Sequence, residues 1–175
     1  MNQSIVTIRS IVIDTINNVN SDHPSMALRS SLMLYQLFSH NLISTPENSG
    51  WINRDRFVFA SGHAFALLYS LLYLSGFNIF NDDLKQFRQW NSVTSGHLEY
   101  KVTYGVDASS GPLGQGVSAV IGIALDEYLM SKNYPTLINH FTYALCGDGD
   151  MQEGITQEAV QLASLWSLGK TDCSL

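Results

Sequence analysis

Apolar residues recur along this chain at two spacings, and each spacing predicts a type of secondary structure. Repeats of three or four residues, typical of amphipathic helices, mark several segments. Their apolar positions are Ile5, Ile8, Val12 and Ile16; Leu28, Leu32, Tyr35 and Phe38; Leu67, Leu68, Leu71 and Leu72; Val117, Val120, Ile121, Ala124 and Leu125; and Ile155, Ala159, Leu162, Ala163 and Trp166. Two short apolar runs, 57–60 and 141–146, predict buried strands. Helices that alternate with such strands favour an α/β fold with a parallel sheet flanked by helices.

Turn and capping residues place the ends of several of these elements. Pro24 suits the first position of a helix, so we expect the second helix to begin there. Gly76 is expected to end the helix that contains the four leucines. Asn81 is a good N-cap for a further short helix. Segments 44–50 and 91–110 contain many Ser, Asn and Gly residues and are predicted to be loops.

The alternation of helices and strands breaks near the C-terminal end. Gly169 is expected to end the last helix, and an apolar strand should follow to finish the strand–helix–strand unit. Residues 171–175 are instead short and polar. We therefore expect residues 1–170 to form a partial domain and residues 171–175 to be a tail outside the pattern. The next strand would then be missing, and the sheet would be incomplete on its C-terminal side.

Composition and charge exclude several classes of partner. A hydrophobic content of 45% with 14% charged residues is typical of a globular protein rather than a disordered one. The net charge is −6, with nine Lys and Arg residues and no basic cluster, so neither a nucleic acid nor a membrane is expected as a partner. The longest apolar run, 64–77, is too short to span a bilayer.

The cysteines and the N-terminal segment indicate in which cellular compartment the protein is expected. Cys146 ends a predicted strand and is most simply a buried free thiol. Two cysteines, Cys146 and Cys173, are too few to form a disulfide framework. The first residues do not combine a basic stretch with an uninterrupted apolar block, so no signal peptide is predicted. A reducing, cytoplasmic location is expected.

The turn Gly147-Asp148-Gly149 has the composition of a site for a magnesium-bound diphosphate. It lies between a predicted strand and a predicted helix. Its glycines allow close approach of the backbone to phosphate, and the carboxylate is a hard oxygen ligand. Asp148 could be a turn residue without a ligand, but the preceding strand, the following helix and the paired glycines favour a ligand. Another nucleotide-binding site is disfavoured, because 111–116 lacks the dinucleotide spacing and the chain has no Gly-Lys-Ser/Thr phosphate loop.

Several stretches together resemble transketolases over nearly the whole chain, up to about Lys170. They are Arg54-Asp55-Arg56-Phe57-Val58, Ser61-Gly62-His63, Phe87-Arg88-Gln89, Gly96-His97-Leu98-Glu99-Tyr100, Gly111-Pro112-Leu113-Gly114-Gln115-Gly116, and Gly147-Asp148-Gly149 with Glu153-Gly154. The Gly-Pro-Leu-Gly-Gln-Gly stretch favours transketolase over deoxyxylulose-phosphate synthase and other thiamine enzymes. The resemblance implies the thiamine-diphosphate-binding fold, a homodimer when the protein is full length, and a place in the pentose phosphate pathway.

The resemblance also implies an activity, in which a two-carbon ketol unit passes from a ketose phosphate to an aldose phosphate. Thiamine diphosphate supplies the bond chemistry, and the protein supplies orientation and proton transfer. By motif, His23 and His97 would be catalytic residues near the substrate hydroxyls, where imidazoles can exchange protons near neutral pH. His63 would bind an oxygen of the diphosphate. Without the motifs around them, single histidines are more often surface or core residues.

The remaining cofactor contacts come from the two glycine-rich stretches. The resemblance makes Asp148 a ligand of Mg²⁺ or another divalent cation, and places Gly149 against the diphosphate. Gly111 and Leu113 would lie against the aminopyrimidine. Glu153 would join a carboxylate network at the dimer interface that communicates with the cofactor, although a carboxylate near a helix N-terminus is also favourable without such a role.

The chain departs from the family pattern in places. Asp22, Met26 and Arg29 stand where the family has Gly or other small residues, and Ala64 replaces a favoured Gly. Asp22 adds a negative charge close to His23. The family's Asn metal ligand and its pyrimidine-binding domain have no counterpart in these residues, so the chain alone is expected to be inactive as a transketolase. The alternative is a non-catalytic remnant that dimerises or binds a partner.

Overall fold

The computed structural model describes residues 2–174, which form two compact units. The first unit comprises the chain up to residue 42 together with 63–106. The second comprises 43–62 and the chain from residue 107 onward. Each unit therefore contains segments that are distant in sequence, and neither boundary was predicted from composition.

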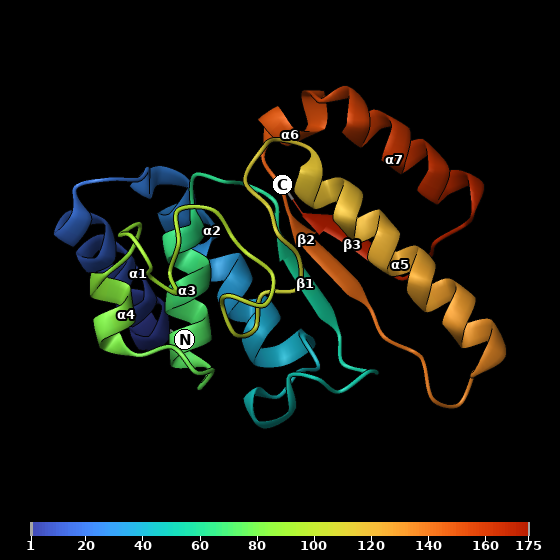
Figure 1. Ribbon diagram of the computed structural model, residues 1–175, viewed down its shortest axis with the longest axis horizontal. Coiled ribbons are helices and arrows are strands. Elements are labelled where there is room, and N and C mark those ends of the chain that lie inside the picture. Colours follow the sequence, from blue (N-terminus) through green and yellow to red (C-terminus); the bar gives the residue numbers. More distant parts are fainter. Residues whose placement is uncertain (1, 175) are drawn as a thin grey trace. The chain divides into compact units, whose positions relative to one another are not determined.

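The first unit is helical (Figure 1). Its elements are α1 (Asn2–Val19), α2 (Pro24–Gln36) continued by a π-helical turn (Leu37–Asn41), α3 (Phe65–Leu74) and α4 (Asn81–Lys85). Helix α1 packs against α2, α3 and α4. The predicted apolar stripe of α1 is confirmed, because each of its residues is 8% exposed or less; they are Ile5, Ile8, Val12 and Ile16. Pro24 begins α2 as expected.

The predicted apolar stripe of α2 is wrong in part. Leu32 is 47% exposed, and the buried side of this helix carries Ala27, Ser31 and Leu34 instead. The reason is a polar contact, since the Arg9 guanidinium donates to Ser31 Oγ at 2.8 Å. Small side chains and this hydrogen bond, rather than the leucines alone, decide which side of α2 faces α1.

Helix α3 is the most apolar element, and its residues from Phe65 to Leu72 are all buried. It has ten residues, and none of the described helices is long and apolar enough to cross a membrane. Past its end, Gly76 takes a positive φ of 84°, as its predicted role in ending the helix requires. The expectation for Asn81 is wrong by one residue: Asn81 begins α4, and Asp83 accepts the Phe80 N–H at 2.7 Å.

The second unit contains a three-stranded parallel sheet in the order β1-β2-β3. Its elements are a 3-10 turn (Pro46–Asn48), β1 (Arg56–Phe59), α5 (Gln115–Asn133), β2 (Thr142–Leu145), α6 (Asp148–Gln152), α7 (Gly154–Leu165) and β3 (Thr171–Ser174). Helix α5 packs on all the strands, and α7 packs on α5 (Figure 1). The predicted strands, the helix that carries Val117 and the α/β class with a parallel sheet are confirmed.

The core of the second unit lies between the sheet and α5. Val58, Val120 and Ala144 are buried in it, at 3% exposure or less. The first turn of α5 approaches β1 so closely that a Cβ added at Gly116 would lie 2.6 Å from Ala60 Cα. Only glycine leaves room for this contact. The close approach brings the beginning of α5 to the end of β1.

A strand does follow the last helix, although the sequence analysis expected it to be missing. Residues 171–174 form β3, which pairs in parallel with β2 so that Ala144 lies opposite Cys173. Residues 171–174 carry no apolar signal because β3 lies at an edge of the described sheet and is only partly buried. Its pairing comes from backbone hydrogen bonds, such as the one from Cys146 N–H to Ser174 O at 3.0 Å, and these need no apolar side chain.

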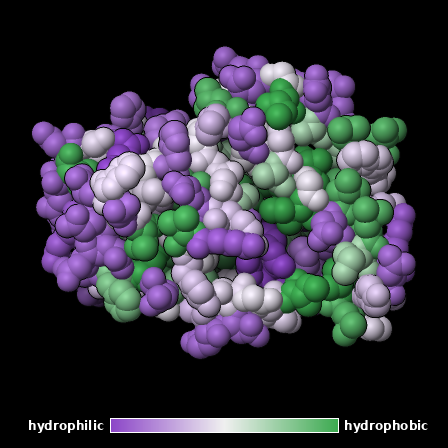
Figure 2. All heavy atoms as spheres, in the orientation of Figure 1, coloured by the Kyte–Doolittle hydropathy of each residue, from purple (hydrophilic) through white to green (hydrophobic). Residues whose placement is uncertain are grey.

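The predicted apolar face of α7 is only partly covered among the described residues. Ile155 and Leu162 are 40% and 42% exposed, whereas Thr156 and Ala159 are buried. The physical reason is that α7 packs on α5 through its small residues. Apolar side chains, green in Figure 2, are accordingly visible on the molecular surface.

Candidate functional site

Three turns meet in the second unit at the carboxyl ends of β1 and β2. One follows β1 at Ser61-Gly62, one follows β2 at Gly147, and the third is the stretch 111–116. The third turn is joined to the first by close contact, because a Cβ added at Gly62 would lie 2.7 Å from the Gly111 carbonyl oxygen. Parallel α/β sheets bind ligands at this edge, outside the carboxyl ends of the strands.

The stretch 111–116 also contacts the segment that follows β2. Gly114 has a φ of 77°, and a Cβ there would lie 2.9 Å from Glu153 Cβ and 3.0 Å from Thr156 Oγ1. A Cβ added at Gly149 would lie 3.5 Å from the Leu113 side chain. Residues that the sequence places in two separate cofactor-binding stretches are therefore neighbours.

Asp150 joins these turns, and sequence reasoning missed it. Its residue is 0% exposed. Gly114 N–H donates to its Oδ1 at 3.0 Å, while Gly147 N–H and Ser61 Oγ donate to its Oδ2 at 2.9 and 3.1 Å. A signal did exist, because an acidic residue at the third helical position, three after Gly147, is a capping position. The contacts to Ser61 and Gly114 carry no such local signal.

The predicted ligands themselves are accessible. Asp148 is exposed at the first position of α6, rather than inside a turn, and Glu153 is exposed between α6 and α7. Leu113 is 43% exposed. Among the described residues, no group of three or more His, Cys, Asp or Glu side chains could hold a metal ion. Asp148 therefore offers a single carboxylate and not a complete metal site.

In the first unit the structure brings two of the predicted histidines together. The rings of His23 and His63 have centroids 6.3 Å apart and planes inclined by 53°. His23 lies directly before α2 at its N-cap, and His63 lies before α3. Both residues are exposed. They can therefore meet a ligand from the same side of the helical unit.

His97 is exposed on a loop that is anchored on both sides of it. Tyr69 Oη donates to Ser95 O at 2.8 Å, and burial raises the pKa of Tyr69 to about 12, so the phenol stays a donor. Leu98 is only 2% exposed. No ring contact joins His97 to His23 or His63 among the described residues.

Asp22, the departure from the family pattern, is buried and paired. Arg88 donates to Asp22 Oδ1 at 3.0 Å, and the Asp22 side chain is 0% exposed. Burial raises the pKa of Asp22, although the hydrogen bond from His23 N–H and the charge of Arg88 oppose the shift. Its φ of 117° is one that glycine adopts freely and other residues rarely adopt. Two atoms of the pair, Asp22 Oδ2 and Arg88 Nε, are buried without a partner.

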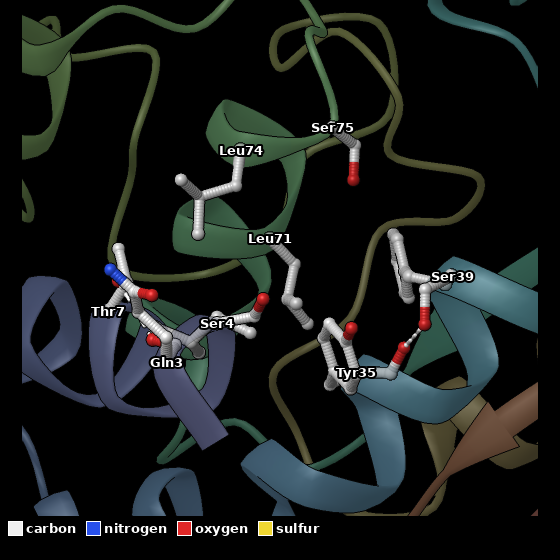
Figure 3. A pocket seen from close by; sticks show the side chains of 10 residues that line it. Gln3, Ser4, Thr7, Tyr35, Ser39, Leu71, Leu74 and Ser75 are labelled. Carbon is white, nitrogen blue, oxygen red and sulfur yellow. Dashed lines mark hydrogen bonds between the residues drawn. The ribbon is translucent and has the colours of Figure 1, made fainter. Parts of the chain in front are cut away.

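A cavity of about 410 Å³ lies in the first unit away from the candidate residues (Figure 3). It is lined by Gln3, Ser4, Thr7, Ile8, Tyr35, Phe38, Ser39, Leu71, Leu74 and Ser75. Ser39 Oγ donates to Tyr35 O across its wall, as the dashed line in Figure 3 shows. No charged side chain is among these lining residues, so this cavity does not offer the acid–base chemistry or the metal ligand that the motifs predict.

Cys146 is a buried free thiol, as predicted. Burial raises its pKa to about 11 from an ordinary value of 9.0, so it is almost wholly protonated near neutral pH. A thiol of this kind is a poor nucleophile. It contributes to the core beside Val117 and Ala60 instead.

Comparison with known families gives one consistent result. The family model for "Transketolase, thiamine diphosphate binding domain" matches residues 1–173. Transketolase of Bacillus subtilis (strain 168) is 47% identical over 172 residues, which are 96% of this chain and 26% of that protein. Transketolase of Geobacillus stearothermophilus is 48% identical over 171 residues, which are 95% of this chain and 26% of that protein.

Solved structures agree with the sequence relatives. A transketolase from Leishmania mexicana has a TM-score of 0.94 and 36% identity, and the match covers 98% of this chain and 26% of that chain. A transketolase from Campylobacter jejuni subsp. jejuni NCTC 11168 has a TM-score of 0.92 and 44% identity, with 97% of this chain and 27% of that chain covered. The chain thus spans about a quarter of the length of these relatives. The predicted resemblance and the predicted fold class are confirmed.

Proposed function

The chain belongs to the transketolase family through its thiamine diphosphate binding domain, and from this premise we propose that it supplies the diphosphate-binding part of a transketolase. The polypeptide that contains this domain would transfer a two-carbon ketol unit between sugar phosphates. The observation that carries the proposal is the convergence of three glycine-containing turns at the carboxyl ends of β1 and β2. These turns bring the predicted cofactor residues of the second unit together.

The residues of the second unit fit thiamine diphosphate. The backbone at Gly149 carries no side chain toward Leu113, and Leu113 is exposed enough to lie against a ring. We assign Gly149 to the diphosphate, and Gly111 with Leu113 to the aminopyrimidine. When bound, the cofactor supplies the carbon centre at which the ketol unit is carried. The chain's own contribution is to orient that cofactor.

The metal is proposed to bind at Asp148. Its exposed carboxylate is the hard oxygen ligand that Mg²⁺ prefers. A magnesium ion takes about six oxygens, so the diphosphate, water and further protein groups would have to complete the coordination. The proposal therefore predicts that metal and cofactor bind together, and that neither binds strongly alone.

The histidines are assigned by family resemblance, supported by their exposure. His63 would bind a diphosphate oxygen, and His23 and His97 would hold or move protons at the substrate hydroxyls. The burial of Asp22 and its pairing with Arg88 favour this reading, because the carboxylate is removed from solvent and lies against a positive charge.

Further proposals concern assembly and location. Helix α7 exposes Val160 and Leu165, at 41% and 75%, and Glu153 lies directly before this helix. Exposed apolar side chains of this kind suit an interface that excludes water. We propose that α7 contributes to a homodimer in the full-length protein, with Glu153 in its carboxylate network, and that the protein is cytoplasmic.

Titration calorimetry with thiamine diphosphate, with and without Mg²⁺, tests the proposal on the 175-residue chain. We expect binding that needs both components and is weakened at least about tenfold by Asp148→Asn, because the amide replaces an anionic ligand. Asp126→Asn, an exposed change on α5, is the matched control. Metal-independent binding, or an equal effect of the two substitutions, would count against the metal assignment.

A ketol-transfer assay completes the test. The chain alone is expected to be inactive, whereas a longer polypeptide carrying it together with a pyrimidine-binding domain should be active. A monodisperse dimer of the chain with no affinity for thiamine diphosphate would instead support the non-catalytic alternative. Ketol transfer by the chain alone would refute the expectation that further segments are needed.

A further inference from the structure

Asp150 has more hydrogen bonds than its local role requires. An acidic residue three positions after an N-cap normally accepts the N–H of that cap, and here Gly147 N–H fills this role. Such a capping carboxylate needs one oxygen and can remain in water. Asp150 is instead 0% exposed, and both of its oxygens accept donors from distant segments.

The two side-chain oxygens of Asp150 accept hydrogen bonds from different segments. Oδ2 accepts Ser61 Oγ from the end of β1 and Gly147 N–H from the end of β2. Oδ1 accepts Gly114 N–H from the residue that precedes α5. The backbone carbonyl of Asp150 accepts Thr156 Oγ1 from α7 at 2.6 Å. One residue thus joins the segments on which the cofactor contacts are proposed to lie.

We propose that Asp150 is a positioning residue that holds the turns after β1 and β2 and the stretch 111–116 in the arrangement needed for cofactor binding. Asp150 does not touch the ligand, because its side chain is wholly buried, whereas Asp148 is exposed. It acts through the backbone of Gly114 and Gly147. The inference rests on the proposed function for the identity of the ligand, but not for the connection between the turns.

A buried carboxylate suits this task for a physical reason. Hydrogen bonds to an ionised acceptor are roughly twice as strong as neutral ones. The donors are two backbone N–H groups and one hydroxyl, whose directions are fixed by β1, β2 and α5. A carboxylate that must satisfy them all has little freedom to turn. The arrangement is therefore defined by several elements of the unit at once.

Amide hydrogen exchange on the 175-residue chain without ligand tests the connection directly. For Asp150→Asn we expect exchange at Gly114 and Gly147 to become at least about tenfold faster, because the amide presents an N–H₂ group to donors. Ser61→Ala is a gentler second variant, and it should change exchange at Gly147, which shares Oδ2 with Ser61, more than at Gly114. Glu158→Gln, exposed on α7, is the matched control.

Thiamine diphosphate affinity in the presence of Mg²⁺ is the second measurement. Asp150→Asn should raise the dissociation constant about tenfold. A merely structural role would lower the melting temperature without changing the dissociation constant. Unchanged exchange, or faster exchange with unchanged affinity, would overturn the inference. A parent chain that does not bind the cofactor would overturn the proposed site, while faster exchange in Asp150→Asn would still support the connection between the turns.

Discussion

Asp150 in the second unit and Asp22 in the first each lie beside an exposed candidate residue, but their surroundings satisfy them differently. Asp150 accepts its hydrogen bonds from backbone N–H groups and a hydroxyl. Asp22 Oδ1 accepts the Arg88 guanidinium at 3.0 Å and the neighbouring His23 N–H at 2.9 Å, and its Oδ2 is buried without a partner. Asp150 therefore uses both oxygens to join distant segments, whereas Asp22 has one satisfied oxygen and relies on Arg88 for its opposite charge. The two carboxylates should respond differently to substitution.

The largest effect is expected from Asp150→Ala. The change leaves the N–H groups of Gly114 and Gly147 and the Ser61 hydroxyl without their acceptor. Because a buried unsatisfied group costs about 1–3 kcal/mol, we expect the free energy of unfolding to fall by about 3 kcal/mol or more. Urea denaturation measures this. A loss below about 1 kcal/mol would mean that water replaces the carboxylate easily, and the contrast with Asp22 would disappear.

Arg88→Met is expected to have the next largest effect. It removes the cation from Asp22, and breaking a buried pair costs about 3–5 kcal/mol. Since the Arg88 side chain is 26% exposed, we expect a smaller loss, about 2 kcal/mol, in urea denaturation. The double variant Asp22→Gly with Arg88→Met should recover most of it, because glycine accepts the φ of 117° and removes the unpaired carboxylate. A double variant no more stable than Arg88→Met would contradict the pairing argument.

The pH dependence of stability tests the burial of Asp22. Burial raises the pKa of Asp22 above its ordinary value of 3.8, so the folded state holds this proton more tightly than the unfolded state. The stabilisation is then fully present below pH 3.8 and is lost as pH rises through the raised pKa. As pH rises through the pKa of Asp22, we expect Asp22→Asn to become more stable relative to the parent. Urea denaturation at a series of pH values measures this difference. A relative gain by the parent would mean that the His23 N–H hydrogen bond and the Arg88 charge together outweigh burial.

The smallest effect concerns Cys146, the residue before Gly147. Because burial raises its pKa to about 11, little thiolate exists at pH 8. Desolvation and the neighbouring Asp172 raise the pKa of Cys173 as well, but its side chain is exposed, so an alkylating reagent should modify it well before Cys146, as read by mass spectrometry of peptides. In Asp150→Ala, labelling of Cys146 should become faster if this turn opens locally. Equal labelling of Cys146 in parent and variant would limit the effect of Asp150 to the hydrogen bonds themselves.

The elements with a local signal were predictable from the sequence. The apolar runs gave β1 and β2, and the helical repeat after Gly116 gave α5. The strand β3 was missed because an edge strand pairs through its backbone, and residues 171–174 show no apolar run. The N-cap expected at Asn81 lies at Phe80 because Asp83 reaches back to that residue. Backbone pairing and capping contacts decided both cases.

The candidate site was predictable as a set of residues but not as a geometry. The motifs identified Asp148, Gly149 and Leu113, and the structure places the last two side by side. The residues that support them were not predicted, because their partners are far apart in sequence. Asp150 bonds Ser61 across 89 residues, and Arg88 bonds Asp22 across 66. No periodicity or spacing rule identifies such pairs.

The long sequence separations around Asp150 have a consequence for the order of folding. Its contact with Gly147 is local, whereas those with Gly114 and Ser61 span 36 and 89 residues. Closing such loops costs chain entropy before the contacts return any energy, so we expect these bonds to form after the rate-limiting step. Substitution of Asp150 should then leave the folding rate nearly unchanged and speed unfolding. Asp150 would act chiefly on how long the folded domain lasts once it has formed.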